Sequence, residues 1–218
     1  MDFFIVIVIS YVVGSLPTSI IVARKIAGID IREHGSGNAG MSNVVRVIGL
    51  KPGIVVGMVD ILKGWLATAW IPIVFMASGG SEGGDFSLVR ITAGGSAVLG
   101  HTYTIFSRFR GGKGVATLAG VMIALYPIAV VVCFLTFGIT FMKWGYVSLS
   151  SMTAAVTLPL SVLLLPWAGL PPVSHLLLFF SLFVPLFVFF THRENIARLR
   201  RGNEKRFDRA TLFSRRET

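Results

Sequence analysis

The sequence predicts an all-α, polytopic membrane protein: a helical bundle of about seven transmembrane helices that forms one integral membrane domain over residues 1–218. Hydrophobic residues make up 54% of the chain, and the mean hydropathy is +0.77. Several apolar runs reach about 18 to 25 residues, the length that crosses a bilayer core. Of the 20 Lys and Arg residues, 17 lie in three clusters, within 24–51, 108–113 and 193–216. Such clusters are typical of cytoplasmic segments between spans.

The net charge of +10 indicates contact with anionic membrane lipids, and no nucleic-acid partner is expected. The single cysteine, Cys133, lies in an apolar run. Neither a disulfide framework nor a cysteine-based metal site is therefore expected. Clusters of His, Asp and Glu with metal-ligand spacing are also missing from the sequence, so no metal is expected. No His is followed five positions later by Asp, which excludes the large acyltransferase class with a His-x4-Asp dyad.

The first span is expected at Phe3–Ala23. It is interpreted as a retained helix because it lacks a basic leader and a small-residue cleavage site. Gly14 and Pro17 could bend this helix or admit a neighbouring helix closely. Polar cytoplasmic segments are expected at 24–52, 100–117 and 192–218.

The second span is expected at Gly53–Ala77 and carries Asp60 and Lys63. Their spacing of three residues puts them on one helical face, where they can pair. The pair either reaches the membrane interface or lines a wet cavity, where intramembrane charges are usually functional. The loop Ser78–Ser87, with acidic but no basic residues, is expected outside. Leu88–Phe106 then returns the chain to the cytoplasm.

The apolar region 115–191 has basic clusters at both ends, so an even number of crossings is expected within it. Tyr126-Pro127 is a natural helix break, which divides the first run into short helices at about 115–126 and 128–142. Two further spans are expected at 146–165 and 174–191, joined by an external turn at 166–172. The N-terminus is then outside and the C-terminus inside. An amphipathic surface helix is expected after His192.

The chain is organised around the stretch Ser107–Thr117, between long apolar runs. Gly111, Gly112 and Gly114 allow a tight turn whose free N–H groups would form an anion site, and a helix that starts near Val115 would add its positive end. Arg108, Arg110 and Lys113 supply positive charge. The stretch is interpreted as a phosphate site at a membrane surface. A basic loop that only follows the positive-inside bias is the other interpretation.

A second polar stretch spans Gly35–Arg46. It matches G-x-G-x-x-G, but neither a buried strand nor a βαβ unit surrounds it, so dinucleotide binding is not expected. Its glycines permit tight backbone, its Ser and Asn side chains offer neutral hydrogen bonds, and Arg46 adds a charge. This mixture suits a small hydroxylated anion. The alternative is a flexible loop before a helix that Ser42 or Asn43 caps.

Two histidine-containing stretches complete the polar segments. Gly100-His101 leads into the glycine loop, and His101 is either a proton-transfer group or a structural group. His192 and Asn195 are three residues apart just beyond the last span, and on a helix they would point the same way. The alternative for 192–204 is a charged cluster that only anchors the last helix.

At these segments the sequence resembles the bacterial acyl-phosphate-dependent glycerol-3-phosphate acyltransferases, integral membrane enzymes of phospholipid synthesis. The resemblance covers the whole chain in length and hydropathy. It is sharpest in three motifs, which appear in order: 35–43, Gly100-His101 with 111–117, and 192–195 with Gly202 and Glu204. The pair Asp60 and Lys63-Gly64 is also similar to the family.

The resemblance implies that the 1-hydroxyl of sn-glycerol 3-phosphate attacks the carbonyl carbon of a fatty acyl phosphate. Lysophosphatidate and inorganic phosphate are then the products, and no cofactor or metal is needed. On this basis the expected catalytic residues are Ser36, Arg46, Lys113, His192 and Asn195. The expected substrate-binding residues are Gly35, Gly37, Asn38, Asn43, His101, Gly111, Gly112, Gly114, Thr117, Arg193 and Glu194.

The expected location is the bacterial inner membrane, with the site facing the cytoplasm and the protein acting as a monomer. Two other functions remain open from the residues alone. One is a small organic-phosphate transporter, although transporters usually show internal repeats and mid-membrane charges, whereas this sequence has no evident repeat and its polar motifs cluster on one face of the membrane. The other is a non-catalytic membrane anchor, which would leave three glycine-rich polar segments unexplained.

Overall fold

The computed structural model describes residues 2–77, 86–170 and 173–207, and every regular element in these ranges is helical. The chain divides into two compact units, Met1–Leu125 and Tyr126–Thr218. The boundary falls at the predicted break before Pro127. Most of the predicted external loop at 78–87 lies outside the described residues, as do Pro171 and Pro172 of the predicted turn at 166–172.

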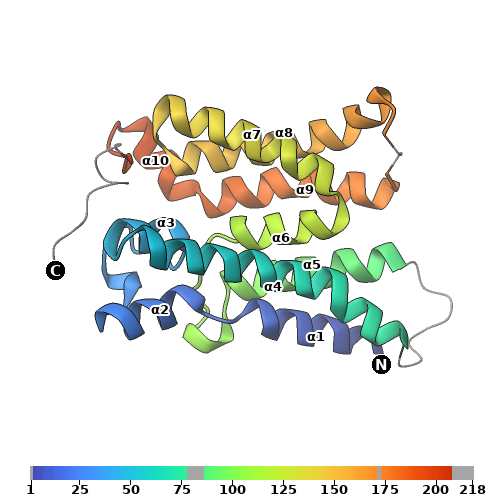
Figure 1. The fold of residues 1–218 in the computed structure, drawn as a ribbon, viewed down its shortest axis with the longest axis horizontal. Coiled ribbons are helices and arrows are strands. Elements are labelled where there is room, and N and C mark those ends of the chain that lie inside the picture. The colour runs from blue at the N-terminus through green and yellow to red at the C-terminus, as the bar shows by residue number, and fades with distance from the viewer. Residues whose placement is uncertain (1, 78–85, 171–172, 208–218) are drawn as a thin grey trace. The chain divides into compact units, whose positions relative to one another are not determined.

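Unit 1 is built on three long helices, α1, α4 and α5, which run side by side in Figure 1 and contact one another pairwise. Shorter helices and two 3₁₀ turns, η1 and η2, carry the polar segments between them. In chain order the elements are α1 Asp2–Gly14, α2 Thr18–Ala27, η1 Ile31–Glu33, α3 Met41–Val47, α4 Leu50–Ala77, α5 Phe86–Thr102, η2 Ile105–Ser107 and α6 Val115–Leu125.

The predicted first span is broken, as Gly14 and Pro17 suggested. α1 ends at Gly14 and α2 begins at Thr18, because Pro17 has no N–H to continue the helical ladder. α2 extends to Ala27, beyond the predicted end at Ala23, and stops at Gly28 with a left-handed φ of 67°. The break leaves non-helical backbone inside unit 1, which must be stabilised by side chains.

The short helix α6 packs closely along α4. A side chain at Gly64 of α4 would collide with the carbonyl oxygen of Thr117, and one at Gly120 of α6 would collide with that of Ile61. Glycine at both positions lets the two backbones touch, as in tightly packed membrane helices. This contact fixes α6, and with it the loop that precedes α6.

Unit 2 consists of α7 Pro127–Trp144, α8 Val147–Leu164, the 3₁₀ turn η3 Leu165–Ala168, α9 His175–Thr191 and α10 Arg193–Arg200. Helix α8 packs against both α7 and α9. Pro127 occupies the first turn of α7, and Gly145 ends that helix with φ 74°. These helices match the predicted segments 128–142, 146–165 and 174–191, and α10 confirms a helix after His192.

Among the described residues, four helical stretches are long and apolar enough to cross a membrane: Phe3–Ala27, Leu50–Ala77, Pro127–Trp144 and Val147–Ala168. A fifth appears if α9 and α10, which are bent by 61° relative to each other, count as one span. Helix α5 has 17 residues and α6 has 11. The fold is therefore an all-helical membrane architecture, whereas the seven-span count and its orientation rest on the charge pattern.

Candidate active site

The first polar segment is anchored to unit 1 by a small apolar core beneath it. Residues from α2, η1, α3, α4 and the intervening loop meet there. The buried members of this core are Ile20, Ala23, Ile31, Ala39, Val44 and Val56. Because buried apolar side chains anchor the segment at several points, the polar residues between them are held in defined positions.

Asn43 organises the glycine-rich loop. Its side chain is fully buried, Oδ1 accepts a hydrogen bond from Ser36 N–H at 2.8 Å, and Nδ2 donates to the carbonyl oxygens of the residues at 31, 34 and 38 at 2.9–3.1 Å. The alternative interpretation, in which Ser42 or Asn43 caps the helix, is wrong, because α3 begins at Met41 and Gly40 is its cap residue. Asn43 instead lies inside the helix and reaches back to the loop.

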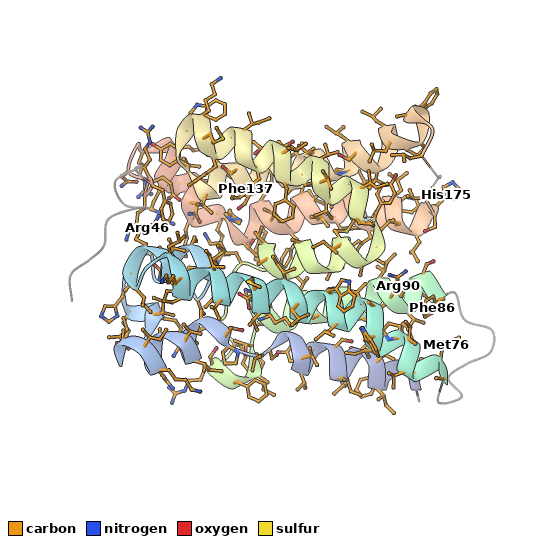
Figure 2. All side chains as sticks on the ribbon, viewed as in Figure 1. Arg46, Met76, Phe86, Arg90, Phe137 and His175 are labelled. Carbon is orange, nitrogen blue, oxygen red and sulfur yellow. The ribbon has the colours of Figure 1, made fainter. Side chains whose placement is uncertain are left out.

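The loop around Ser36 has the tight backbone that its glycines predicted. Gly35 and Gly37 have left-handed φ values of 62° and 74°, and a side chain at Gly35 would collide with Oδ1 of Asn43. Ser36 and Asn38 are half-buried in this loop, and Arg46 is half-buried on α3. Figure 2 places Arg46 at the end of unit 1 opposite Met76 and Arg90.

Arg32 joins the first polar segment to the second. Its guanidinium pairs with Asp30 at 2.6 Å, and its Nη1 donates to the carbonyl oxygen of Ser107 at 3.1 Å. The hydrogen bonds from Arg32 lower the pKa of Asp30 to about 2. The hydrogen bond to Asp30 in turn raises the pKa of Arg32, so this connection stays charged at neutral pH.

The polar segment 100–117 contains a turn in which two non-glycine residues adopt a strained backbone conformation. Arg108 and Phe109 have φ values of 55° and 57°, a region that L side chains rarely occupy. Ser107 Oγ donates to the carbonyl oxygen of Arg110 at 2.9 Å and closes the turn. Arg108 and Arg110 are exposed, as expected for charges that face a membrane surface.

The glycines that follow serve close packing more than anion binding. Gly111 N–H donates to the carbonyl oxygen of Thr102 at 3.0 Å, and Gly112 N–H donates to that of His101 at 3.2 Å. The expectation that these two N–H groups are free for an anion is therefore wrong. A side chain at Gly112 would meet His101 Nε2 and, at 2.7 Å, the carbonyl oxygen of Ala39.

The anion-binding potential lies just after these glycines. Gly114 turns the chain with φ 80°, α6 starts at Val115 as predicted, and Leu118 N–H donates to the carbonyl oxygen of Gly114 at 2.7 Å. The N–H groups of the preceding helical turn thus have no acceptor within α6. Lys113 is half-buried directly before this helix end, which is a favourable arrangement for a phosphate.

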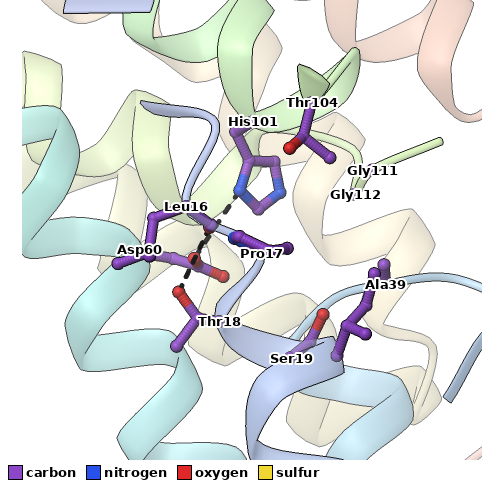
Figure 3. A pocket seen from close by; sticks show the side chains of 11 residues that line it. Leu16, Pro17, Thr18, Ser19, Ala39, Asp60, His101, Thr104, Gly111 and Gly112 are labelled. Atoms are coloured by element: carbon purple, nitrogen blue, oxygen red, sulfur yellow. Dashed lines mark hydrogen bonds and ion pairs between the residues drawn. The ribbon is translucent and has the colours of Figure 1, made fainter. Parts of the chain in front are cut away.

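His101 and Thr117 are buried instead of facing outward. The His101 ring is 7% exposed, and Nδ1 lies 3.6 Å from Oδ1 of Asp60. Figure 3 shows this imidazole directed toward Asp60 in a small pocket that Gly111 and Gly112 also line. Thr117 is fully buried in the α4–α6 contact, and its hydroxyl oxygen has no hydrogen-bond partner among the described residues.

The third polar segment belongs to unit 2. His192 and Asn195 are both buried, at 3% and 7% exposure. Nδ1 of His192 lies 2.8 Å from the carbonyl oxygen of Val188, which directs Nε2 away from α9. Asn195 Nδ2 donates to Oε1 of Glu204 at 2.5 Å.

Glu204 holds this segment together. Besides Asn195, its carboxylate accepts hydrogen bonds from Ser148 Oγ at 2.8 Å and from Arg198 Nε at 2.7 Å. Burial alone would raise the pKa of Glu204, but these donors lower it overall. The carboxylate is therefore a fixed acceptor that orients Asn195.

Arg193 and Glu194 are exposed and have local partners. Arg193 lies over the Phe190 ring and donates to the Phe190 carbonyl oxygen at 3.2 Å. Glu194 lies 3.9 Å from Arg198 on the same helix. Neither contact indicates a substrate, so their expected role in binding stays a prediction.

Within unit 1 the structure brings together the residues around Ser36, Arg32, His101 and the start of α6. His192 and Asn195 are placed within unit 2. Sequence reasoning assigned Asn43 to substrate and did not recognise Arg32 or the bonding role of Glu204. For Arg32, the sequence signal was its position two residues after Asp30 in a segment that is otherwise rich in glycine.

Comparisons with known proteins agree on one family. The sequence model of the family described as glycerol-3-phosphate acyltransferase matches residues 4–202. A glycerol-3-phosphate acyltransferase of Geotalea daltonii is 40% identical over 210 residues, which cover 94% of this chain and 97% of that protein. One of Pelodictyon phaeoclathratiforme is 38% identical over 222 residues, with 92% and 94% covered.

Two solved structures are also similar. Both are crystal structures of PlsY (YgiH), an integral membrane glycerol 3-phosphate acyltransferase. The glycerol 3-phosphate form has a TM-score of 0.81 at 34% identity, and the lysophosphatidic acid form has 0.78 at 35%. In both cases the match covers 98% of this chain and 100% of the other.

Proposed function

The chain belongs to the glycerol-3-phosphate acyltransferase family and is an acyltransferase, and we propose that its acyl donor is a fatty acyl phosphate. The 1-hydroxyl oxygen of sn-glycerol 3-phosphate attacks the acyl carbonyl carbon, and the bond from that carbon to the phosphate oxygen breaks. The hydroxyl proton leaves with inorganic phosphate. The other product is lysophosphatidate, so the reaction begins phospholipid synthesis.

The observation that carries this proposal is the position of Lys113. It stands between two glycines at the N-terminus of α6, where a positive charge joins N–H groups that have no acceptor within the helix. An acyl phosphate is an activated mixed anhydride with a good leaving group. The enzyme then needs mainly positioning and charge stabilisation, for which no metal or cofactor is required.

The remaining roles follow from side-chain chemistry. Lys113 and the first turn of α6 would contact the donor phosphate, with Gly111, Gly112 and Gly114 shaping the loop. Ser36, Arg46 and Asn195 would contact glycerol phosphate, and His192 would orient or deprotonate the attacking hydroxyl. Supporting contributions to binding are assigned to Gly35, Gly37, Asn38, Arg193 and Glu194. The buried Asn43, His101 and Thr117 contribute by holding the loops and α6 in place.

For the membrane arrangement we propose seven crossings in the bacterial inner membrane, with the N-terminus outside, the polar segments in the cytoplasm and the protein acting as a monomer. The basic clusters at 24–51, 108–113 and 193–216 support this orientation. A cytoplasm-dependent reporter fused after Thr218 should be active, and the same reporter before Met1 should be silent. The reverse pattern would contradict the topology.

The activity proposal is tested by comparing two lysine variants in purified, folded form. Lys113→Ala should lower the formation of lysophosphatidate from acyl phosphate by about 100-fold or more, because a charge-assisted contact is lost where charge develops. Lys143→Ala is the matched control, since Lys143 stacks on Trp144 at the end of α7 and should retain normal turnover. Equal activity of both variants would remove Lys113 from the site.

A further inference from the structure

Three charged or titratable side chains are buried together behind the glycine loop of unit 1. Asp60, Lys63 and His101 are 2%, 4% and 7% exposed. Lys63 Nζ lies 2.8 Å from Oδ1 of Asp60, and His101 Nδ1 lies 3.6 Å from the same oxygen. The two residues from α4 and the one from α5 therefore form one connected cluster.

The cluster stabilises the non-helical backbone between α1 and α2. Lys63 Nζ donates to the carbonyl oxygen of Leu16 at 3.0 Å, in the non-helical stretch before Pro17. Thr104 Oγ1 donates to the carbonyl oxygen of Ser15 at 2.5 Å. A backbone break inside a membrane protein needs such donors, because its freed carbonyls cannot turn to water.

The same cluster supports the loop that carries Lys113. The backbone carbonyl of His101 accepts the hydrogen bond from Gly112 N–H, and the His101 ring lies so close to Gly112 that even a methyl group there would collide with Nε2. Figure 3 shows Asp60 and His101 with Leu16 and Pro17 on one side and the two loop glycines on the other. One cluster thus links the break to the loop.

Stability alone is a weak reason for such a cluster. Burying an ion pair costs about as much desolvation as its attraction returns, and apolar residues of similar volume often stabilise as well or better. We propose that Asp60, Lys63 and His101 are positioning residues, which fix the 111–114 loop and hence Lys113 for acyl transfer. This inference rests on the proposed function, since it assigns Lys113 to the donor phosphate.

Arg90 provides a control from the same unit. It is a half-buried cation that also donates to backbone carbonyls: Nε donates to Thr68 O at 3.3 Å and Nη2 to Ala124 O at 2.5 Å. Thr68 O is available because Pro72, four residues later, has no N–H. Figure 2 places Arg90 at the end of unit 1 away from Arg46. Its two hydrogen bonds run to backbone carbonyls of α4 and α6, so its expected role is helix packing.

The experiment compares purified Asp60→Asn/Lys63→Met, His101→Gln and Arg90→Met with the unaltered protein. The double variant leaves no unpaired buried charge, so it should fold even where a single change would not. The melting temperature, kcat and the KM for glycerol 3-phosphate are measured for each. We expect kcat to fall about 10-fold or more in the double variant and in His101→Gln, because a displaced loop misplaces Lys113.

In these two variants the KM should change less than about threefold, which separates a positioning effect from lost substrate binding. Arg90→Met should melt at lower temperature but keep its kcat per folded molecule. Normal kcat in the folded double variant, or a fall in kcat that tracks melting temperature across all three variants, would overturn the inference. Absence of lysophosphatidate with the unaltered protein would instead count against the proposed function.

Discussion

Arg32 donates a hydrogen bond from Nη1 to the carbonyl oxygen of Ser107 across 3.1 Å, and this single contact ties two polar segments that are 75 residues apart in the chain. The guanidinium is held in place by Asp30, whose carboxylate it contacts at 2.6 Å. The loop around Ser36 and the turn before Lys113 are therefore fixed relative to each other within unit 1. Loss of this link should affect both at once.

Asp30→Asn should lower the stability of the folded protein at pH 7 by about 1–2 kcal/mol. The hydrogen bond from Arg32 depresses the pKa of Asp30 from 3.8 to about 2. A carboxylate whose pKa is lowered in the folded state stabilises the fold fully at pH values above its pKa in the unfolded chain. This contribution is lost as the pH falls from 3.8 through about 2. Melting temperatures of the two proteins should thus converge in acid. Glu33→Gln is the control, because Glu33 is exposed; a constant difference between Asp30→Asn and the unaltered protein at all pH values would contradict the assignment.

Gly35→Ala should be much more harmful than Gly28→Ala. Both glycines have left-handed φ values, 62° and 67°, so both substitutions pay a backbone cost of about 1 kcal/mol. Only at Gly35 would the new methyl group also collide with Oδ1 of Asn43, whereas the space at Gly28 is open. Activity and melting temperature of the two purified variants provide the comparison. Equal losses would mean that Asn43 can move without disturbing the loop.

Glu204→Gln should loosen the segment after α9. The carboxylate accepts hydrogen bonds from Asn195, Ser148 and Arg198. The NH₂ group of a glutamine would face at least one of these donors without an acceptor, which should lower the free energy of unfolding by about 2 kcal/mol. Hydrogen exchange measured by mass spectrometry should rise over 193–207. Glu194→Gln is a suitable control because its carboxylate is 76% exposed and 3.9 Å from Arg198, a pair worth little. Unchanged exchange in Glu204→Gln would show that other contacts hold the segment.

Helix ends and breaks were predictable because they depend on local chemistry. Pro17 and Pro127 lack an N–H, and both interrupt helices where the sequence indicated. The pairing of Asp60 with Lys63 also followed from helical spacing, since residues three apart share a face. The start of α6 directly after the glycine loop was likewise predictable from the change from glycine-rich to apolar sequence.

The contacts that give each segment its shape were not predictable in this way. Asn43 has the composition of a helix cap, yet its side chain reaches back to four backbone groups of the loop before it. Gly111 and Gly112 look like an anion-binding turn, but their N–H groups are used by carbonyls of α5. Such side-chain and backbone bonds between distant segments leave no periodic pattern in a sequence.

Ser36→Ala should weaken the use of glycerol 3-phosphate but leave acyl transfer possible. In direct transfer the acyl group is never bound to the protein, so Ser36 is not needed as a nucleophile. Ser36 lies in the loop that Asn43 shapes and would act as a hydrogen-bonding group worth about 1–3 kcal/mol. Intact mass is measured after incubation with acyl phosphate alone. An adduct heavier by one acyl group, missing in Ser36→Ala, would contradict direct transfer and make Ser36 the nucleophile.

The central claim is that this chain joins an acyl group from acyl phosphate to glycerol 3-phosphate. The most direct measurement uses the purified protein with labelled glycerol 3-phosphate and one donor at a time: acyl phosphate, acyl-coenzyme A or acyl carrier protein bearing the same chain. We predict lysophosphatidate and inorganic phosphate in about one-to-one ratio with acyl phosphate, and no product with either thioester. Product formed from a thioester, or none formed from acyl phosphate, would contradict the account.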